Sequence, residues 1–75
     1  MTLEKFVKLF AGQFDDTAIE EFNPNTNYKE LEEWGSLVAL SIISMVDEEF
    51  EKQLTGAELR NINSIEELYN LIEAK

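Results

Sequence analysis

The chain has 75 residues, and its 16 acidic and 6 basic side chains give a formal net charge of −10. A charge of this size disfavours binding to nucleic acid or anionic membranes, and it favours partners with basic protein surfaces. Because the sequence contains neither cysteine nor histidine, we expect no disulfide, no metal site with thiolate or imidazole ligands and no Ser-His-Asp catalytic triad.

The first predicted element is an amphipathic helix over residues 2–14. Thr2 is its predicted N-cap, and its apolar side chains recur at three- and four-residue intervals, at Leu3, Phe6, Val7, Phe10 and Phe14. Charged residues from Glu4 to Lys8 interrupt what would be the apolar core of a signal peptide. We therefore expect a cytoplasmic protein.

A long acidic connection with a net charge of −6 follows over residues 15–35. The spacing Thr17-x-x-Glu20 predicts a capping box, and Thr26 is expected to cap a second short turn. A structureless loop of this length would be unusual, so we expect four apolar residues to fix it to the core: Ile19, Phe22, Tyr28 and Leu31. Trp34 is expected either to anchor the loop in the bundle or to form part of the docking surface, and the anchor is favoured. The carboxylates lack the spacing of a calcium loop, so we predict a solvated acidic surface and no metal site, with weak binding of divalent cations as the alternative.

The longest helical pattern runs from Ser36 to Glu51. At 100° per residue it has a broad apolar face and a polar face that carries Ser41, Ser44, Asp47, Glu48 and Glu51. Leu37 and Leu40 lie on or near the polar face, which indicates a docking surface rather than packing. Spacing alone predicts that Ser36 is the N-cap of this helix. The apolar run from Leu37 to Val46 is too short to span a membrane.

Two further helices are predicted after this one. A short helix over residues 55–62 has Leu59 and Ile62 as its main apolar positions. The spacing Ser64-x-x-Glu67 is a capping box, and it begins a final helix whose apolar stripe is Ile65, Leu68, Tyr69, Leu71 and Ile72. No strand pattern occurs. We therefore expect one all-α domain over residues 1–75: a small up-down bundle of three main helices and one short helix, with a long first loop.

Three stretches resemble the acyl carrier protein family, in the family's order and spacing. Ser36-Leu37 with the run from Leu40 to Phe50 resembles the helix whose serine carries a phosphopantetheine arm. Phe22-x-Pro-x-Thr-x-Tyr-x-x-Leu31 resembles the long first loop, and Asn63-Ser-Ile-Glu-Glu-Leu68 resembles the start of the last helix. From residue 22 to residue 68 they span 47 of the 75 residues, which is far more specific than a serine alone. The resemblance implies covalent phosphopantetheine on Ser36, installed by a phosphopantetheinyl transferase.

The sequence departs from the family pattern at three positions. The family motif is Asp-Ser-Leu, whereas this chain has Gly35 before the serine. The family aspartate helps the transferase, so its loss affects which transferase works and how fast. Ser41 and Ser44 stand where the family often has a glutamate and an apolar residue, so partner preference is expected to differ from that of a generic fatty-acid-synthesis carrier.

The resemblance also divides the residues around Ser36 into two expected surfaces. Transferases and acyl-transferring or synthase enzymes with basic docking surfaces are expected to approach a face made of Leu37, Leu40, Ser41, Ser44, Asp47, Glu48 and Glu51. An acyl chain is expected to enter a groove lined by Val38, Ala39, Ile42, Val46, Leu59 and Ile62.

Three classes of function compete for this sequence. The first is a monomeric carrier of acyl thioesters in fatty-acid, lipid or related biosynthesis, with aminoacyl, peptidyl or polyketide carriers as alternatives. The second is an unmodified acidic helical adaptor. An enzyme is disfavoured, and no catalytic residue is predicted, because a serine needs a neighbouring base and Lys29 is the only base near Ser36 in sequence.

Overall fold

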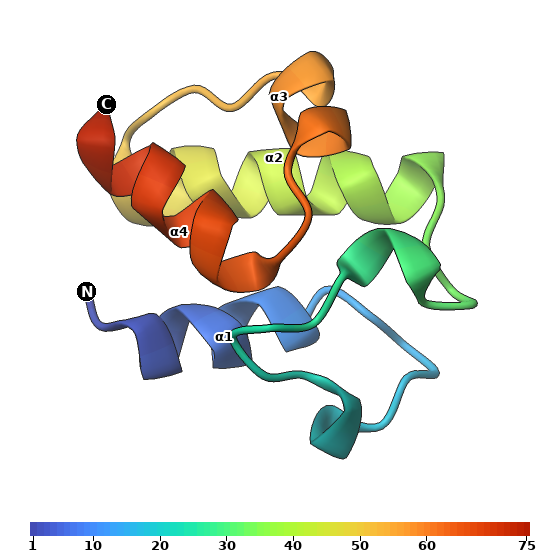
Figure 1. Cartoon of the computed structure of the whole chain (residues 1–75). Coiled ribbons are helices and arrows are strands. Elements are labelled where there is room, and N and C mark those ends of the chain that lie inside the picture. Colours follow the sequence, from blue (N-terminus) through green and yellow to red (C-terminus); the bar gives the residue numbers. More distant parts are fainter.

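The computed structural model describes all residues, 1–75, and contains four α-helices and no strand. The helices are α1 (Leu3–Ala11), α2 (Ser36–Phe50), α3 (Gly56–Asn61) and α4 (Ile65–Ala74). Two 3-10 turns, at Ile19–Glu21 and Tyr28–Glu30, lie in the long connection between α1 and α2. The expected all-α bundle of three main helices and one short helix is confirmed (Figure 1).

Helix α2, with 15 residues, is the longest helix of the fold. It runs antiparallel to α1 (Figure 1), and α1 packs against both α2 and α4. The short helix α3 packs against α2. Both chain ends lie at the same end of the molecule (Figure 1), where the Tyr69 hydroxyl donates a hydrogen bond of 2.6 Å to the carbonyl oxygen of Met1.

Three of the four helices begin at a side-chain cap. Thr2 accepts from the backbone N–H of Lys5, as predicted. Ser64 caps α4, also as predicted, but the Glu67 carboxylate accepts from the backbone N–H of Asn63 rather than from that of Ser64. A full capping box that the sequence reading missed, Thr55 with Glu58, begins α3. Its Thr-x-x-Glu spacing was visible in the sequence.

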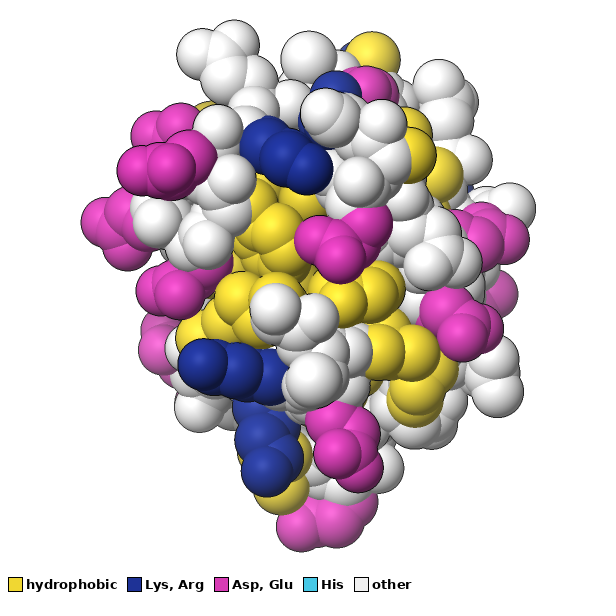
Figure 2. Space-filling model, turned by 90° about the vertical axis from the view of Figure 1, so that its left-hand side faces the viewer, with side chains coloured by type: hydrophobic (Ala, Val, Ile, Leu, Met, Phe, Trp, Pro, Cys, Tyr) yellow, Lys and Arg dark blue, Asp and Glu magenta, His cyan; other side chains and the backbone are white.

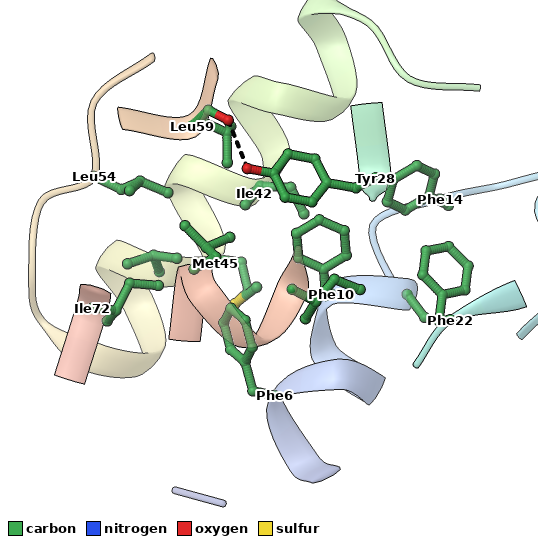
Figure 3. Close-up of a cluster of buried hydrophobic side chains, with 14 residues drawn as sticks. Phe6, Phe10, Phe14, Phe22, Tyr28, Ile42, Met45, Leu54, Leu59 and Ile72 are labelled. Carbon is green, nitrogen blue, oxygen red and sulfur yellow. Dashed lines mark hydrogen bonds between the residues drawn. The ribbon is translucent and has the colours of Figure 1, made fainter. Parts of the chain in front are cut away.

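The core consists of 14 buried side chains, all of them hydrophobic. Much of it is aromatic, because each of the eight aromatic rings contacts at least one other ring. Phe10 lies at its centre, against Phe6, Phe14, Phe22 and Tyr28 (Figure 3). The aromatic stripe of α1 therefore joins the long loop to the helices, which gives this small domain a continuous core.

The long loop is fixed differently from the prediction. The Thr17 hydroxyl donates to the Glu33 carboxylate, so the first 3-10 turn has Ala18 before it and no side-chain cap. The hydroxyl of Thr26 bonds backbone groups of the loop, and the second turn is capped by Asn27 instead. The capping predictions for Thr17 and Thr26 were thus wrong. Both hydroxyls bind groups elsewhere in the loop, and the side chain of Asn27 caps the second turn instead.

The apolar residues of the loop divide into two groups. Phe22 and Tyr28 are buried, and Leu31 packs against the core from a half-buried position, as expected. Ile19 is 59% exposed, so the prediction that it fixes the loop was wrong. Trp34 is half-buried, with its ring 4.9 Å from that of Tyr28 and stacked at 6.4 Å on Phe14. Its expected packing into the bundle is confirmed.

The acidic side chains are almost entirely without ionic partners. Lys75 with Glu58, at 2.8 Å, is the single salt bridge of the structure. On the face where the two termini lie, carboxylates are spread around a central group of hydrophobic side chains, with only a few basic side chains among them (Figure 2). The net charge of −10 is therefore not balanced locally.

Candidate functional site

At the N-terminal end of α2, Ser36 is exposed and no side chain caps the helix. The helix begins at Ser36 itself, Gly35 is the N-cap, and no side chain accepts from the first turn. The prediction that Ser36 caps the helix was therefore wrong. The first intrahelical bond runs from the N–H of Ala39 to the carbonyl oxygen of Gly35, at 2.9 Å. The N–H groups ahead of Ala39 thus point out of the helix end without helical partners, beside an exposed serine side chain.

Ser36 lies at the edge of a surface pocket of about 250 Å³ between α2 and α3. The pocket is lined by Trp34, Gly35, Ser36, Ala39, Gly56, Leu59 and Arg60. Although the chain carries 16 carboxylates, none lines this pocket, and Arg60 is the one charged residue in its wall. Gly35 is extended at φ −179°, and a Cβ there would meet nothing within 4 Å. An aspartate, as in the family motif, would therefore fit at this position.

Two side chains of the long loop hold α3 in place beside the pocket. The Tyr28 hydroxyl donates to the carbonyl oxygen of Leu59, at 2.6 Å (Figure 3). Burial, and then the negative charge of Glu67, raise the pKa of Tyr28 well above its usual range, so it remains a donor. Lys29 donates to the carbonyl oxygen of Arg60 at 2.8 Å and to Asn63 Oδ1. Lys29 is therefore bound to the end of α3 rather than to Ser36.

Glu33 fixes the segment that leads into Ser36. Its carboxylate accepts from the backbone N–H groups of Asp15 and Asp16, at 2.7 and 2.9 Å, and from the Thr17 hydroxyl, at 2.7 Å. The Thr17 hydroxyl first, and then the two backbone N–H groups, hold the pKa of Glu33 below its usual value. The sequence reading missed this role, because no local spacing connects residues so far apart in the chain.

The predicted docking residues divide between two surfaces. Leu37 is 82% exposed and Leu40 is 61% exposed. With Ser41, Ser44 and Glu48 they line a shallow groove of about 400 Å³, to which Leu9 of α1 and Gln13, two residues after α1, also contribute. Asp47 lies outside that groove, in a smaller recess near the loop that follows α2. Glu51 ends the helix in a left-handed conformation at φ 55°. The sequence did not indicate Leu9 and Gln13, because the packing of α1 on α2 cannot be read from either helix alone.

The predicted acyl-groove residues lie at different depths. Ala39 and Leu59 line the pocket beside Ser36. Ile42 and Val46 are fully buried in the core, and Val38 and Ile62 pack against it from half-buried positions. The pocket thus touches the core at Leu59, whereas the buried side chains of Ile42 and Val46 do not line it.

A second and larger pocket, of about 460 Å³, lies in the long loop and is strongly acidic. Its lining is Asp16, Thr17, Glu21, Glu30, Leu31, Glu32 and Glu33. No group of three or more acidic side chains is arranged to hold a metal ion. This pocket is the electrostatic opposite of the one beside Ser36.

Comparison with known proteins identifies the family. A sequence model of the family described as "Phosphopantetheine attachment site" matches residues 4–72. The chain therefore belongs to the family of phosphopantetheine-binding carrier domains, which confirms the resemblance to acyl carrier proteins and the covalent phosphopantetheine that it implied. Searches of curated proteins and of solved structures found no significant match. None of the helices has the length and apolar character needed to cross a membrane.

The residues beside Ser36 fit a covalently attached phosphodiester. Free backbone N–H groups and the positive end of the helix dipole favour an anion at this point. The pocket wall adds one guanidinium and no carboxylate. The acidic pocket of the loop offers no such environment, since its charged side chains are all carboxylates.

Proposed function

We propose that this protein is an acyl carrier protein and that Ser36 carries the phosphopantetheine arm. The observation that carries the proposal is the exposed and uncapped serine at the first residue of α2, inside the stretch that matches the family. A serine at a helix start normally caps the helix. Here the hydroxyl is left available to a modifying enzyme instead.

The arm, once attached, supplies a thiol that holds acyl groups as thioesters. The chain's own residues have simpler tasks. The N–H groups at the start of α2 stabilise the phosphodiester, and Leu37 offers an apolar contact to partner enzymes beside it. We propose no catalysis by this chain, because Lys29 is bound to α3 and leaves Ser36 without a base. The transferase must supply the base that activates the hydroxyl.

We further propose a monomeric cytoplasmic carrier, a single domain over residues 1–75, that serves fatty-acid or lipid biosynthesis. A short alkyl cargo would contact Ala39 and Leu59 in the pocket. A longer chain would need Ile42 and Val46 to move apart from α3, and it would gain about 0.8 kcal/mol for each methylene that it buries. Methyl chemical shifts of Ile42 and Ile62 test this, since they should differ between the holo and acylated proteins. Unchanged shifts would mean that the cargo stays in solvent.

The test of attachment is the intact mass of the apo protein after incubation with a phosphopantetheinyl transferase and coenzyme A. We expect the mass of one phosphopantetheine to be added to the wild type and to the control Ser41→Ala, and nothing to be added to Ser36→Ala. The melting temperature of Ser36→Ala should be essentially unchanged, because no cap is lost. Loading of Ser36→Ala would overturn the assignment, and no loading of any form would favour the unmodified adaptor.

A further inference from the structure

Arg60 is the only arginine of the chain, and its guanidinium has no ionic partner. The residue lies in the last turn of α3, and its side chain lines the same pocket as Ser36. The Nη1 atom lies 3.5 Å from the point where a Cβ on Gly56 would stand, so the side chain folds back over the first residue of α3. The single salt bridge of the structure involves Lys75 and Glu58.

The surroundings of the guanidinium are unusual in a protein with 16 acidic residues. The pocket that it lines contains no carboxylate, and no acidic residue occupies the first turn of α2. Gly35 adds no side chain. A guanidinium binds a phosphate through two parallel hydrogen bonds, which a lysine ammonium cannot do. The charge of the pocket wall and the guanidinium that it shares with Ser36 therefore suit a phosphodiester.

We propose that Arg60 is a positioning residue that binds the phosphodiester of the arm on Ser36 and holds the base of the arm in the pocket between α2 and α3. This inference rests on the attachment proposed above. The arm then leaves the protein along the wall formed by Trp34 and Leu59 rather than extending freely into solvent.

The scaffold beneath Arg60 suits this task. Lys29 binds the carbonyl oxygen of Arg60, and Tyr28 binds that of Leu59, so the backbone of α3 is tied to the long loop. Neither bond involves the guanidinium. The backbone is thus fixed while the charged group remains free to bind an anion.

The chain contains its own reporter for the test, because Trp34 is its only tryptophan and lines the same pocket. We would record ¹H–¹⁵N spectra of the apo and holo proteins and follow the Trp34 indole N–H, the Arg60 Nε–H and the ³¹P resonance. The expected result is that both N–H signals shift when the arm is attached and that the shifts become smaller in high salt.

Variants of the basic residue separate a specific contact from a change in net charge. In Arg60→Gln, the shift of the Trp34 indole between apo and holo forms should become smaller, because the ion pair that holds the arm beside the ring is lost, and the ³¹P line should narrow as the arm becomes more mobile. Arg60→Lys should recover part of the effect. Lys5→Gln, which removes the same charge from an exposed position on α1, should leave every signal as in the wild type.

Two results would overturn the inference. One is an Arg60 Nε–H signal that does not respond to attachment of the arm. The other is an equal response of the ³¹P line to Arg60→Gln and Lys5→Gln, which would show only a general charge effect. The intact mass of each sample is measured first. A sample that is not loaded at Ser36 counts against the proposed attachment, whereas a loaded sample without these shifts counts against Arg60 alone.

Discussion

The two ends of α2 carry charge in the order that helix stability disfavours. Its first turn has no acidic residue, although carboxylates are stabilising there. Its last turns carry Asp47, Glu48 and Glu49 with no basic residue, and Glu51 follows as the C-cap. Helices α1 and α3 have the favourable arrangement, each with a glutamate in the first turn and a basic residue in the last.

Compared with α1 and α3, α2 has charges that do not stabilise the helix. Glu51 strengthens the argument, because it adopts a left-handed conformation at φ 55°, at a position where glycine is usual. Under the proposed function each end has a reason. The N-terminal end is left free of carboxylates for a covalently bound phosphodiester, and the C-terminal end offers carboxylates to basic partner surfaces.

The largest effect is expected for Leu37→Ala at the N-terminal end. When a transferase binds, it should remove this side chain from water. Truncating the side chain should then cost about 1–3 kcal/mol of transition-state binding, so kcat/KM for loading should fall by the corresponding factor at low and high salt alike. Since Leu37 is 82% exposed, the melting temperature should hardly change. Leu40→Ala, one turn lower, is the matched control and should have a smaller effect. Equal loading rates for the wild type and Leu37→Ala would show that this leucine is not a docking contact.

Tyr28→Phe should weaken the support of the same end. It leaves the carbonyl oxygen of Leu59 without its buried donor, which should lower the free energy of unfolding by about 1–3 kcal/mol. Tyr69→Phe is the control, because its hydrogen bond to Met1 is exposed and should matter much less. Denaturant unfolding of both variants measures the difference. Equal losses would mean that the tie between the loop and α3 is not important for stability.

Neutralising the C-terminal end should have opposite effects on stability and on docking. Asp47→Asn with Glu48→Gln removes carboxylates from the negative end of the helix dipole, so the free energy of unfolding should rise by about 0.3–1 kcal/mol. The Michaelis constant for loading should rise at low salt only, since exposed charges mainly accelerate association. If neutralising Glu30, Glu32 and Glu33 raised it instead, partners would dock over the long loop.

The smallest effect is expected for Glu33→Gln, and it should depend on pH. The folded-state pKa of Glu33 is lowered, so the unfolded state binds this proton more readily than the folded state. The carboxylate therefore stabilises the fold above the unfolded pKa of about 4.3, and this contribution disappears as the pH falls through the lower folded value. The difference in melting temperature between wild type and variant should be largest at neutral pH and vanish in acid. Glu32→Gln is the control, and a pH-independent difference would contradict this account.

The sequence was sufficient for the helices and for the exposed side chains of α2. Apolar periodicity predicted the three main helices, and Leu59 and Ile62 indicated the short one. The position of Leu37 on a polar arc predicted an exposure that the structure confirms. The sequence did not predict the contacts between distant segments. The Glu33 carboxylate binds groups at residues 15–17, and Leu9 completes a groove on α2. Such contacts depend on how helices pack, which a local pattern does not contain.

The cap of α2 shows the same limit at a single residue. A serine before an apolar run predicts an N-cap, but the helix begins one residue earlier than that pattern requires, with Gly35 as the cap. The extended backbone of Gly35 makes it the N-cap, and the residue types alone do not predict that conformation. The unpaired guanidinium of Arg60 was likewise visible only once α3 was placed beside α2.

In the proposed carrier, the phosphorus of the arm is bonded to the side-chain oxygen of Ser36. A through-bond ¹H–³¹P correlation spectrum of the holo protein tests it directly, because only protons a few bonds from phosphorus give a signal. We expect one protein cross-peak, from the phosphorus to the β-protons of Ser36. A cross-peak to Ser41, Ser44 or Ser64 instead would contradict it.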